Sequence, residues 1–284
     1  MSERVQRVFL IGTGSAGTAL GLWLSRRGHR LVGAWNRSVR RARTAEEALS
    51  IPVGAEDWPT LPDCDVVLVA VSDGAIAEVG ERLRPHLRPG MVVAHTSGSL
   101  PASALGEQSV PRGSVHPLVA MRSPEIAADA LNRAMLTVEG DADAVARLSD
   151  LVEGARVQRL EAKDKTVYHA AAVIASNLAV ALVAEAAELA SSVGIHDAER
   201  ALAELSFVAI ENVLERGTAA GLTGPVSRGD VDTVRAHLGA LKDPTRKVYR
   251  ELSLRALELA RVRGLESEKV HALQTVLRDE RLTG

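Results

Sequence analysis

The sequence predicts an α/β domain with a mostly parallel, doubly wound sheet, followed by an all-α C-terminal domain. Two observations support this prediction. Up to about residue 162, short runs of β-branched residues alternate with helical patterns, as is typical of parallel strands joined by crossover helices. Beyond that point the strand-like runs end, and long patterns rich in Ala, Leu, Glu and Arg continue. We therefore expect two domains, residues 1–162 and 163–284.

The individual elements follow from these patterns, with Pro- and Gly-rich turns between them. Strands are expected at residues 7–12, 30–36, 65–71, 91–95, 114–118, 135–139 and 156–160. Helices of the first domain are expected at residues 15–27, 39–49, 76–83 and 142–153. Helices of the second domain are expected at residues 165–193, 196–216, 230–241, 244–263 and 266–280. The first helix of the second domain is expected to be continuous and buried.

The composition excludes several classes of protein. The formal net charge of −2 argues against a nucleic-acid or membrane-surface partner, which usually requires a basic patch. Cys64 is the only cysteine, so the chain has no internal disulfide and no multi-cysteine zinc site, and a reducing compartment fits best. The longest apolar stretch, 170–184, is interrupted by Ser176 and Asn177 and is too short to span a membrane. We expect a soluble, cytoplasmic protein without a catalytic metal.

A glycine-rich turn follows the first expected strand. The segment VFLIGTGSAGTAL places Gly12, Gly14 and Gly17 in the spacing G-x-G-x-x-G, between a strand and a helix. In this context the first glycine makes a tight turn, the second lets the backbone approach a diphosphate, and the third packs the helix on the strand. The phosphates then bind the N-terminus of the helix. This predicts a dinucleotide-binding Rossmann domain, with Thr13, Ser15 and Ala16 also at the cofactor; the alternative is a glycine-rich turn without a ligand.

The end of the second expected strand indicates which dinucleotide binds. NAD-binding proteins usually place Asp or Glu there to hold the ribose 2′-hydroxyl group. This chain has AWNRSVRRAR, with neutral Asn36 followed by Arg37 and Ser38. Guanidinium groups suit the geometry of a 2′-phosphate, so we expect NADP rather than NAD. The alternative is that the arginines at 40–43 only decorate an exposed helix.

Four further segments carry a resemblance to a known family: HTSGSL at 95–100, SVHPL at 114–118, YHAAAVIASN at 168–177 and LTGPVSRGD at 222–230. The chain resembles the 6-phosphogluconate-dehydrogenase-like superfamily, which includes pyrroline-5-carboxylate reductase, ketopantoate reductase and prephenate dehydrogenase. It is most similar there to bacterial Rossmann-like proteins whose helical C-terminal domain has no assigned function. The resemblance implies the fold and the cofactor and leaves the substrate open.

Polar residues cluster where expected strands end. Ligands of a parallel sheet bind beyond the carboxyl ends of its strands. There the chain carries Val71 and Ser72 after one strand and Ser97 after the next. We expect all three at the cofactor, with Ser97 also at the substrate. Resemblance to the HP segment of prephenate dehydrogenases implies that His116 lies at the substrate; the alternative for each histidine is a structural role.

The segment YHAAAVIASN provides the candidate catalytic residues. On a helix, Lys165, His169 and Ser176 form one stripe, and Asn177 flanks it. In β-hydroxyacid dehydrogenases and ketopantoate reductases, this helix supplies a Lys as proton donor and an Asn that orients the substrate. Here His169 occupies the expected position of the Asn, so either Lys165 or His169 is the expected donor. The alternative is that Tyr168 and Asn177 are structural or pair across a dimer interface.

The loop LTGPVSRGD presents a candidate ligand for an anion. Asp230 is suited to cap the helix that follows, whereas Arg228 has no such local purpose. We expect Arg228 to bind an anionic group of the substrate.

Together these residues predict an NADP-dependent oxidoreductase that transfers hydride between NADPH and a small carboxylate-bearing carbonyl or imine compound, as ketopantoate or pyrroline-carboxylate reductases do. The alternative is a non-catalytic NADP-binding sensor or regulatory protein. The long Ala-rich helix after Lys165 also predicts a homodimer.

Overall fold

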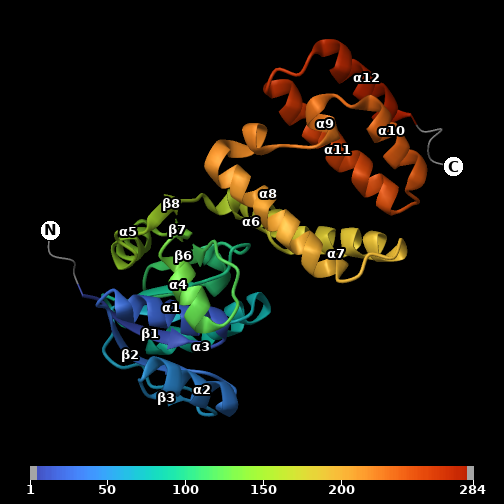
Figure 1. The fold of residues 1–284 in the computed structure, drawn as a ribbon. Helices are drawn as coiled ribbons and strands as arrows, with labels where there is room; N and C mark the ends of the chain where they lie inside the picture. The colour runs from blue at the N-terminus through green and yellow to red at the C-terminus, as the bar shows by residue number, and fades with distance from the viewer. Residues whose placement is uncertain (1–4, 280–284) are drawn as a thin grey trace. The chain divides into compact units, whose positions relative to one another are not determined.

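The computed structural model describes residues 5–279. It divides into two compact units, Met1–Ser176 and Asn177–Gly284, which Figure 1 colours from blue to yellow-green and from yellow to red. The predicted domain boundary after residue 162 marks the change in composition. The structural division falls 14 residues later (176 − 162), because the helix that begins at Lys165 packs with the first unit.

The first unit is built on one eight-stranded sheet, with strand order β3-β2-β1-β4-β5-β6-β7-β8. All pairs are parallel except β6 with β7. The strands are β1 (Arg7–Ile11), β2 (Arg30–Trp35), β3 (Val53–Gly54), β4 (Val66–Val69), β5 (Val92–His95), β6 (Arg112–Pro117), β7 (Met135–Gly140) and β8 (Arg156–Arg159). This confirms the predicted fold class and all seven predicted strands, and it adds the two-residue strand β3.

Helices cover the two faces of this sheet (Figure 1). They are α1 (Ser15–Arg26), α2 (Val39–Leu49), α3 (Ile76–Leu83), α4 (Pro124–Leu131) and α5 (Ala142–Leu151). Helix α6 (Lys165–Ala175) follows β8, and its one buried residue is Lys165. One core contains Trp23 of α1, Leu131 of α4 and Leu148 of α5, packed on one face. A second core contains Ile76 and Leu83 of α3, packed on the other face. Burial on both faces is what a parallel sheet requires. Helix α4 was not predicted.

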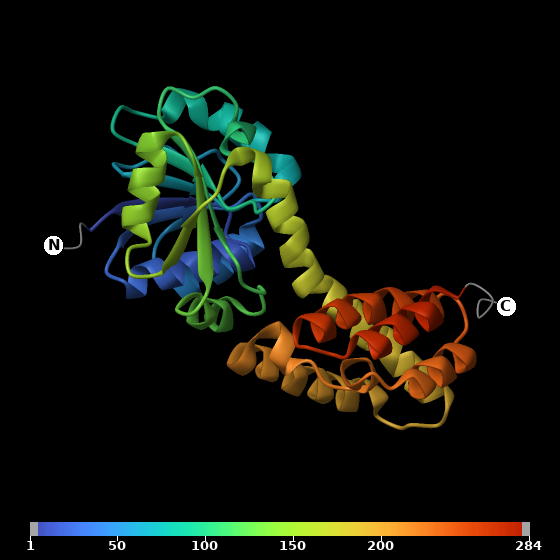
Figure 2. The same cartoon turned by 90° about the horizontal axis from the view of Figure 1, so that it is seen from above.

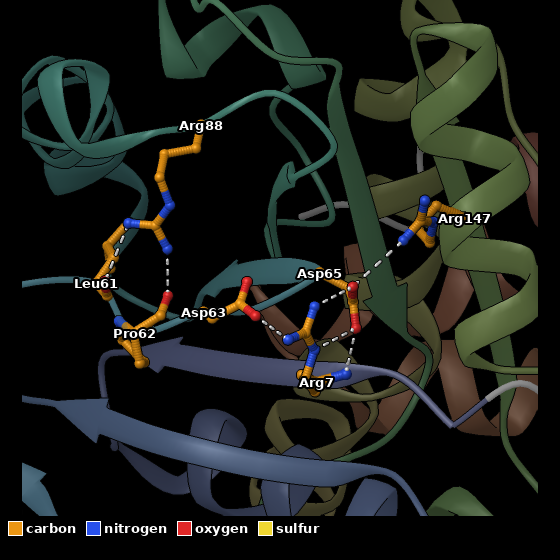
Figure 3. Close-up of polar contacts among 7 residues, drawn as sticks. All are labelled: Arg7, Leu61, Pro62, Asp63, Asp65, Arg88 and Arg147. Carbon is orange, nitrogen blue, oxygen red and sulfur yellow. Dashed lines mark hydrogen bonds and ion pairs between the residues drawn. The ribbon is translucent and has the colours of Figure 1, made fainter.

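A cluster of charged residues lies at the amino ends of β1 and β4 (Figure 3). The Arg7 guanidinium donates to Asp65 at 3.0 and 3.2 Å and also pairs with Asp63. This contact holds the pKa of Asp65 below its usual range. Arg88 donates at 3.2 and 2.6 Å to the backbone carbonyl groups of Leu61 and Pro62. The cluster is at the opposite edge of the sheet from the glycine-rich turn and ties the loops there together.

The predicted continuous helix 165–193 is interrupted at Ser176. Helix α6 ends at Ala175, and α7 (Asn177–Ser192) begins two residues later. The backbone of Ser176 has φ −120° and ψ −77°, and its hydroxyl donates to the carbonyl of Ala172 at 2.7 Å. Such a back-bond is known to bend helices. In the single chain Val167, Ile174 and Val180 are more than half exposed, so the expected burial of this helix stays a prediction that depends on the expected partner subunit.

The described part of the second unit, residues 177–279, contains helices and no strand. Its helices are α7, α8 (Ala198–Gly221), α9 (Pro225–Arg228), α10 (Val231–Ala240), α11 (Thr245–Val262) and α12 (Ser267–Arg278). The predicted helices are confirmed, the short α9 is additional, and residue 280 at the end of the last one lies outside the described residues. In Figure 2 the orange and red helices pack on one another around a small core that includes Val234, Leu257 and Leu273.

Candidate functional site

The glycine-rich turn has room for a ligand. Gly12 has φ +94°, and a Cβ atom there would lie 2.3 Å from the carbonyl oxygen of Ala70, so only glycine fits. A Cβ atom on Gly17 would lie 2.0 Å from the carbonyl oxygen of Gly12. A Cβ atom on Gly14, by contrast, would meet no described atom within 4 Å. Two of the glycines are therefore required by packing, and the third borders open space at the N-terminus of α1, where a diphosphate fits.

The end of β2 is joined to this turn by Asn36. Asn36 is buried, and its Nδ2 donates to Oγ1 of Thr13 at 3.0 Å. Its Oδ1 accepts the backbone N–H of Ser38 at 2.9 Å, and Ser38 caps the N-terminus of α2. Arg37 lies between them and is exposed. Asn36 and Ser38 thus fix the backbone around Arg37 and leave its guanidinium available to a ligand.

The remaining expected cofactor residues lie around the same turn. Ser15 is exposed and Ala16 half-buried at the start of α1. Val71, after β4, is half-buried, and its Cγ1 would be 2.9 Å from a Cβ atom on Gly12. Ser72 is exposed and precedes the short 3-10 helix η1 (Asp73–Ala75). The structure therefore brings the first-unit cofactor residues to one edge of the sheet.

The loop after β5 is held in one conformation by buried polar groups. The ring of His95 is fully buried; its Nδ1 accepts the N–H of Ser97 at 3.1 Å and its Nε2 donates to the carbonyl of Pro101 at 3.0 Å. The Ser97 hydroxyl accepts the N–H groups of Ser99 and Leu100 at 3.2 and 3.1 Å. Ser97, expected at the substrate, thus uses its hydroxyl to shape this loop.

Two histidines pack against this loop at Gly98. A Cβ atom on Gly98 would lie 2.7 Å from Nδ1 of His169 and 2.8 Å from Nε2 of His116, so the two rings fit only against a glycine. The rings are edge-to-face, with centroids 6.0 Å apart. Nδ1 of His116 is 2.9 Å from the Tyr168 hydroxyl. Nδ1 of His169 is buried and has no hydrogen-bond partner among the described residues. A buried unpaired nitrogen is uncommon and is often found at functional sites.

Burial controls the charge of these histidines. Burial lowers the pKa of His95 to about 4. Burial, together with the nearby Lys165 and His169, also lowers the pKa of His116 to about 4. Both rings are therefore neutral near pH 7. A neutral His116 can donate or accept a hydrogen bond, but it is not a cationic acid.

These shifts predict a loss of stability in acid. In the unfolded chain both histidines take up protons near their ordinary pKa of 6.5, whereas in the folded chain they do so near 4. The free energy of unfolding should therefore be highest above pH 6.5. It should fall as the pH drops towards 4, by at most about 3 kcal/mol for each histidine. Urea unfolding can be followed by the fluorescence of Trp23, Trp35 and Trp58, the chain's three tryptophans, which all lie in the first unit.

Two variants, one a test and one a control, check this prediction. His95→Gln should reduce the acid-dependent loss, because one of the two shifted groups is gone. His196→Gln, at an exposed position of the second unit, should leave it unchanged. An acid dependence that is the same in all three proteins would contradict the assignment.

Lys165 lies beneath the same loop. Its side chain is 1% exposed, and Nζ donates to the carbonyl of Ser97 at 3.0 Å and to the hydroxyl of Ser114 at 2.8 Å. Desolvation lowers the pKa of Lys165. The predicted stripe thus brings Lys165 and His169 to one loop, but at different depths.

Comparisons with known proteins agree with this fold. Residues 2–118 match the Rossmann-like domain family, and residues 134–256 match the domain of unknown function DUF2520. The chain combines a Rossmann-like domain with a DUF2520 domain. The DUF2520 match begins at β7 and so includes α5, β8 and α6 of the first unit as well as helices of the second. The two family matches together confirm the resemblance predicted from the sequence.

Several solved structures are similar along most of the chain. A protein from Bacteroides fragilis, assigned as an NADP oxidoreductase, is 23% identical with a TM-score of 0.73, covering 89% of this chain and 98% of its own. Protein TM1727 from Thermotoga maritima is 26% identical with a TM-score of 0.73, covering 90% and 99%. A 1-pyrroline-5-carboxylate reductase from Streptococcus pyogenes is 16% identical with a TM-score of 0.59, covering 96% and 97%. No curated protein matches the chain.

Three further expected site residues, Ser176, Asn177 and Arg228, lie on other segments of the chain than the histidine loop. Ser176 is exposed at the break between the two helices, and its hydroxyl bonds to its own helix. Asn177 and Arg228 belong to the second unit and are exposed. Arg228 ends the short helix α9, and Asp230 caps α10 as predicted, with its carboxylate accepting the N–H of Thr233. The roles of Ser176, Asn177 and Arg228 at a substrate stay predictions.

Two buried residues of the site, Ser114 in β6 and Glu139 in β7, were not singled out from the sequence. Glu139 in β7 accepts the N–H of Ala102 at 2.8 Å and the hydroxyl of Ser114 at 3.1 Å. The two residues face each other in the antiparallel pair of β6 and β7. The available signal was a carboxylate inside an otherwise apolar strand, MLTVEG, which indicates a buried partner.

Proposed function

We propose that this protein is an NADP-dependent oxidoreductase that transfers hydride between NADPH and a small carboxylate-bearing carbonyl or imine compound. One observation carries the proposal. The carboxyl ends of β1, β4, β5 and β6 lie at the same edge of the sheet and carry both the open glycine turn and His116, whose ring contacts His169 of α6. The oxidoreductase named among the similar structures supports the reaction class, at the level of the fold.

The residues of the first unit divide the work between binding and proton transfer. NADPH, when bound, supplies a hydride. The N-terminus of α1 binds the diphosphate, with Gly14 leaving the space for it. Neutral His116, oriented by Tyr168, donates a hydrogen bond to the substrate oxygen or nitrogen. His169 gives the proton to the alkoxide or amine as it forms. We favour His169 over Lys165 because Lys165 is 1% exposed.

The substrate class is the finer part of the proposal. Fold-level similarity to a pyrroline-5-carboxylate reductase supports a cyclic imine or keto acid. Arg228 is the proposed ligand of the substrate carboxylate. Loss of NADPH absorbance, measured with a panel of keto acids and cyclic imines, tests this directly. Oxidation with at least one of them is expected. NADPH that binds but is oxidised by none of them would favour the non-catalytic sensor instead.

NADPH is expected to stabilise the protein more than NADH does. Neutral Asn36 leaves no carboxylate to repel a 2′-phosphate, and the exposure of Arg37 supports its pairing with that group. The melting temperature should rise more with NADPH than with NADH at equal concentrations, and Arg37→Ala should narrow the difference. Arg43→Ala, in the exposed part of α2, is the control. An equal or larger rise with NADH would contradict the assignment of NADP.

The protein is further proposed to be a cytoplasmic homodimer. Apolar side chains on α8 are exposed in the single chain, including Leu205 at 63%, Phe207 at 64% and Leu214 at 82%. Exposed apolar area of this kind usually marks an interface.

The run Ala162–Ser192 is long and apolar enough to cross a membrane, by length and composition only. Its Lys165, however, is buried against the sheet of the first unit.

Light scattering at micromolar concentration should give twice the chain mass of 30.1 kDa. Leu214→Glu should shift the protein towards monomer, because it places a charge in the apolar surface, and Glu215→Gln in the same helix should not. A monomer mass for the unchanged protein would rule the dimer out.

A further inference from the structure

Lys165 belongs to a buried polar network that spans four elements of the first unit. Its Nζ donates to the carbonyl of Ser97, in the loop after β5, and to the hydroxyl of Ser114 in β6. The Ser114 hydroxyl donates in turn to Oε2 of Glu139 in β7 at 3.1 Å. Ser114 and Lys165 are each 1% exposed and Glu139 is 7% exposed. A buried ammonium and a buried carboxylate are thus connected through one hydroxyl group.

This network holds the loop after β5 at both ends. Lys165 binds the carbonyl of Ser97 where the loop begins, and Glu139 binds the N–H of Ala102 where it ends. Between these two points lies Gly98, against which both site histidines pack. Any shift of the loop therefore moves the surface on which His116 and His169 rest.

The geometry leaves Lys165 no free path to a substrate. Its ammonium is enclosed and donates two hydrogen bonds to protein atoms. Losing the proton would leave the carboxylate of Glu139 buried without its balancing charge, which is costly. These contacts favour a lysine that holds its partners in place.

We infer that Lys165 is a positioning residue, which together with Glu139 and through Ser114 fixes the Ser97–Ala102 loop beneath the histidine pair. The effect of Lys165 on turnover rests on the proposed function. Its role in orienting the loop and the ring of His116 does not depend on that function.

The charge of Lys165 also acts on His116. The groups that face this ring are Lys165, Tyr168 and His169 from α6 and Asp73 from η1. Lys165 and His169 lower the pKa of His116, and Asp73 raises it. Removing the lysine charge should therefore raise the pKa of His116, which a role confined to filling space would not do.

The test uses the full chain with three variants and one control. Lys165→Met removes the charge and keeps the length, Glu139→Gln removes the opposite charge, and the double variant removes both. Lys247→Met, at an exposed lysine of α11, is the control. Ser114→Ala removes the bridging hydroxyl with little change in volume, and is the variant of choice if Lys165→Met does not fold.

Three results are expected. NMR titration of isotope-labelled histidine should show a raised pKa of His116 in Lys165→Met and an unchanged one in Lys247→Met. The melting temperature should fall in Lys165→Met and in Glu139→Gln. Its fall in the double variant should be smaller than the sum of these two losses, because the two residues of a buried pair are coupled. Turnover should fall about 100-fold in both Lys165→Met and Ser114→Ala, as misplaced catalytic groups do.

The titration and the melting temperatures need no substrate, so they test the inference even if no oxidoreductase activity is found. An unchanged pKa of His116 in Lys165→Met, or additive losses of melting temperature, would overturn it. Full turnover in Ser114→Ala beside none in a folded Lys165→Met would overturn it in favour of Lys165 as the proton donor.

Discussion

Gly14→Ala is expected to fold as the parent protein does and to bind NADPH about 10- to 100-fold more weakly. The new Cβ atom meets no described protein atom within 4 Å, and Gly14 has φ −73°, which alanine adopts readily. The space that the methyl group enters is where the diphosphate approaches the N-terminus of α1. Overpacking a close contact costs roughly 1–3 kcal/mol, which corresponds to this loss of affinity.

A matched control separates the ligand from the fold. Gly239→Ala in α10 also adds a Cβ atom that meets no described atom within 4 Å, but far from the glycine turn in sequence and in the second unit. Fluorescence titration with NADPH should distinguish the two variants, while their melting temperatures stay close to that of the parent. Equal affinity for NADPH in Gly14→Ala and the parent would show that the diphosphate lies elsewhere.

His169→Ala is expected to lower the maximal rate by about two to four orders of magnitude, the range of a lost general acid. NADPH affinity should be unchanged, because its phosphates are proposed to bind at Gly12–Gly17 and Arg37. Stopped-flow measurement of NADPH oxidation, alongside a binding titration, gives both quantities. If His169→Ala kept the parent rate, His169 would not be the donor.

The second unit provides a control of closely similar geometry. His237 and Tyr249 have the same 2.9 Å contact between Nδ1 and hydroxyl as His116 and Tyr168, with the same 5.6 Å between ring centroids. Tyr168→Phe should lower turnover, since His116 loses the group that orients it, whereas Tyr249→Phe should not. Equal effects of the two substitutions would indicate that both tyrosines serve only stability.

The cofactor turn could be predicted from the sequence because its determinants are local. Gly12, Gly14 and Gly17 lie within six residues, and the strand and helix around them show clear periodicity. The same holds for Asp230, whose capping role depends on the three residues that follow it.

The loop network could not be predicted in this way, because its members are distant in sequence. Ser97 and Lys165 are 68 residues apart, and Ser114 and Glu139 meet only through the antiparallel pairing of β6 and β7. A mostly parallel sheet was expected, and nothing in the sequence indicated the antiparallel pair that brings this serine beside this carboxylate. The sequence showed Lys165 and His169 on one helix stripe, but not that one is enclosed and the other is at the loop surface.

The break at Ser176 illustrates a further limit. Apart from the polar pair Ser176 and Asn177, the helical pattern continues from Lys165 to Val193, so it predicts one helix. At the interruption the Ser176 hydroxyl bonds to the backbone of its own helix, and the division between the two units falls at the same residue. The strand β3, with two residues, and the helix α9, with four, are too short for any period to show.

The central claim is that the histidine pair and the glycine turn serve one hydride transfer. The most direct measurement supplies NADPH that carries deuterium on the transferred position of the nicotinamide, together with the panel of keto acids and cyclic imines, and analyses the products by mass spectrometry. We predict a product that carries one deuterium with the parent protein and with Gly239→Ala, and far less of it with His169→Ala. NADPH that binds tightly while no product gains deuterium would contradict the account and leave a dinucleotide-binding sensor.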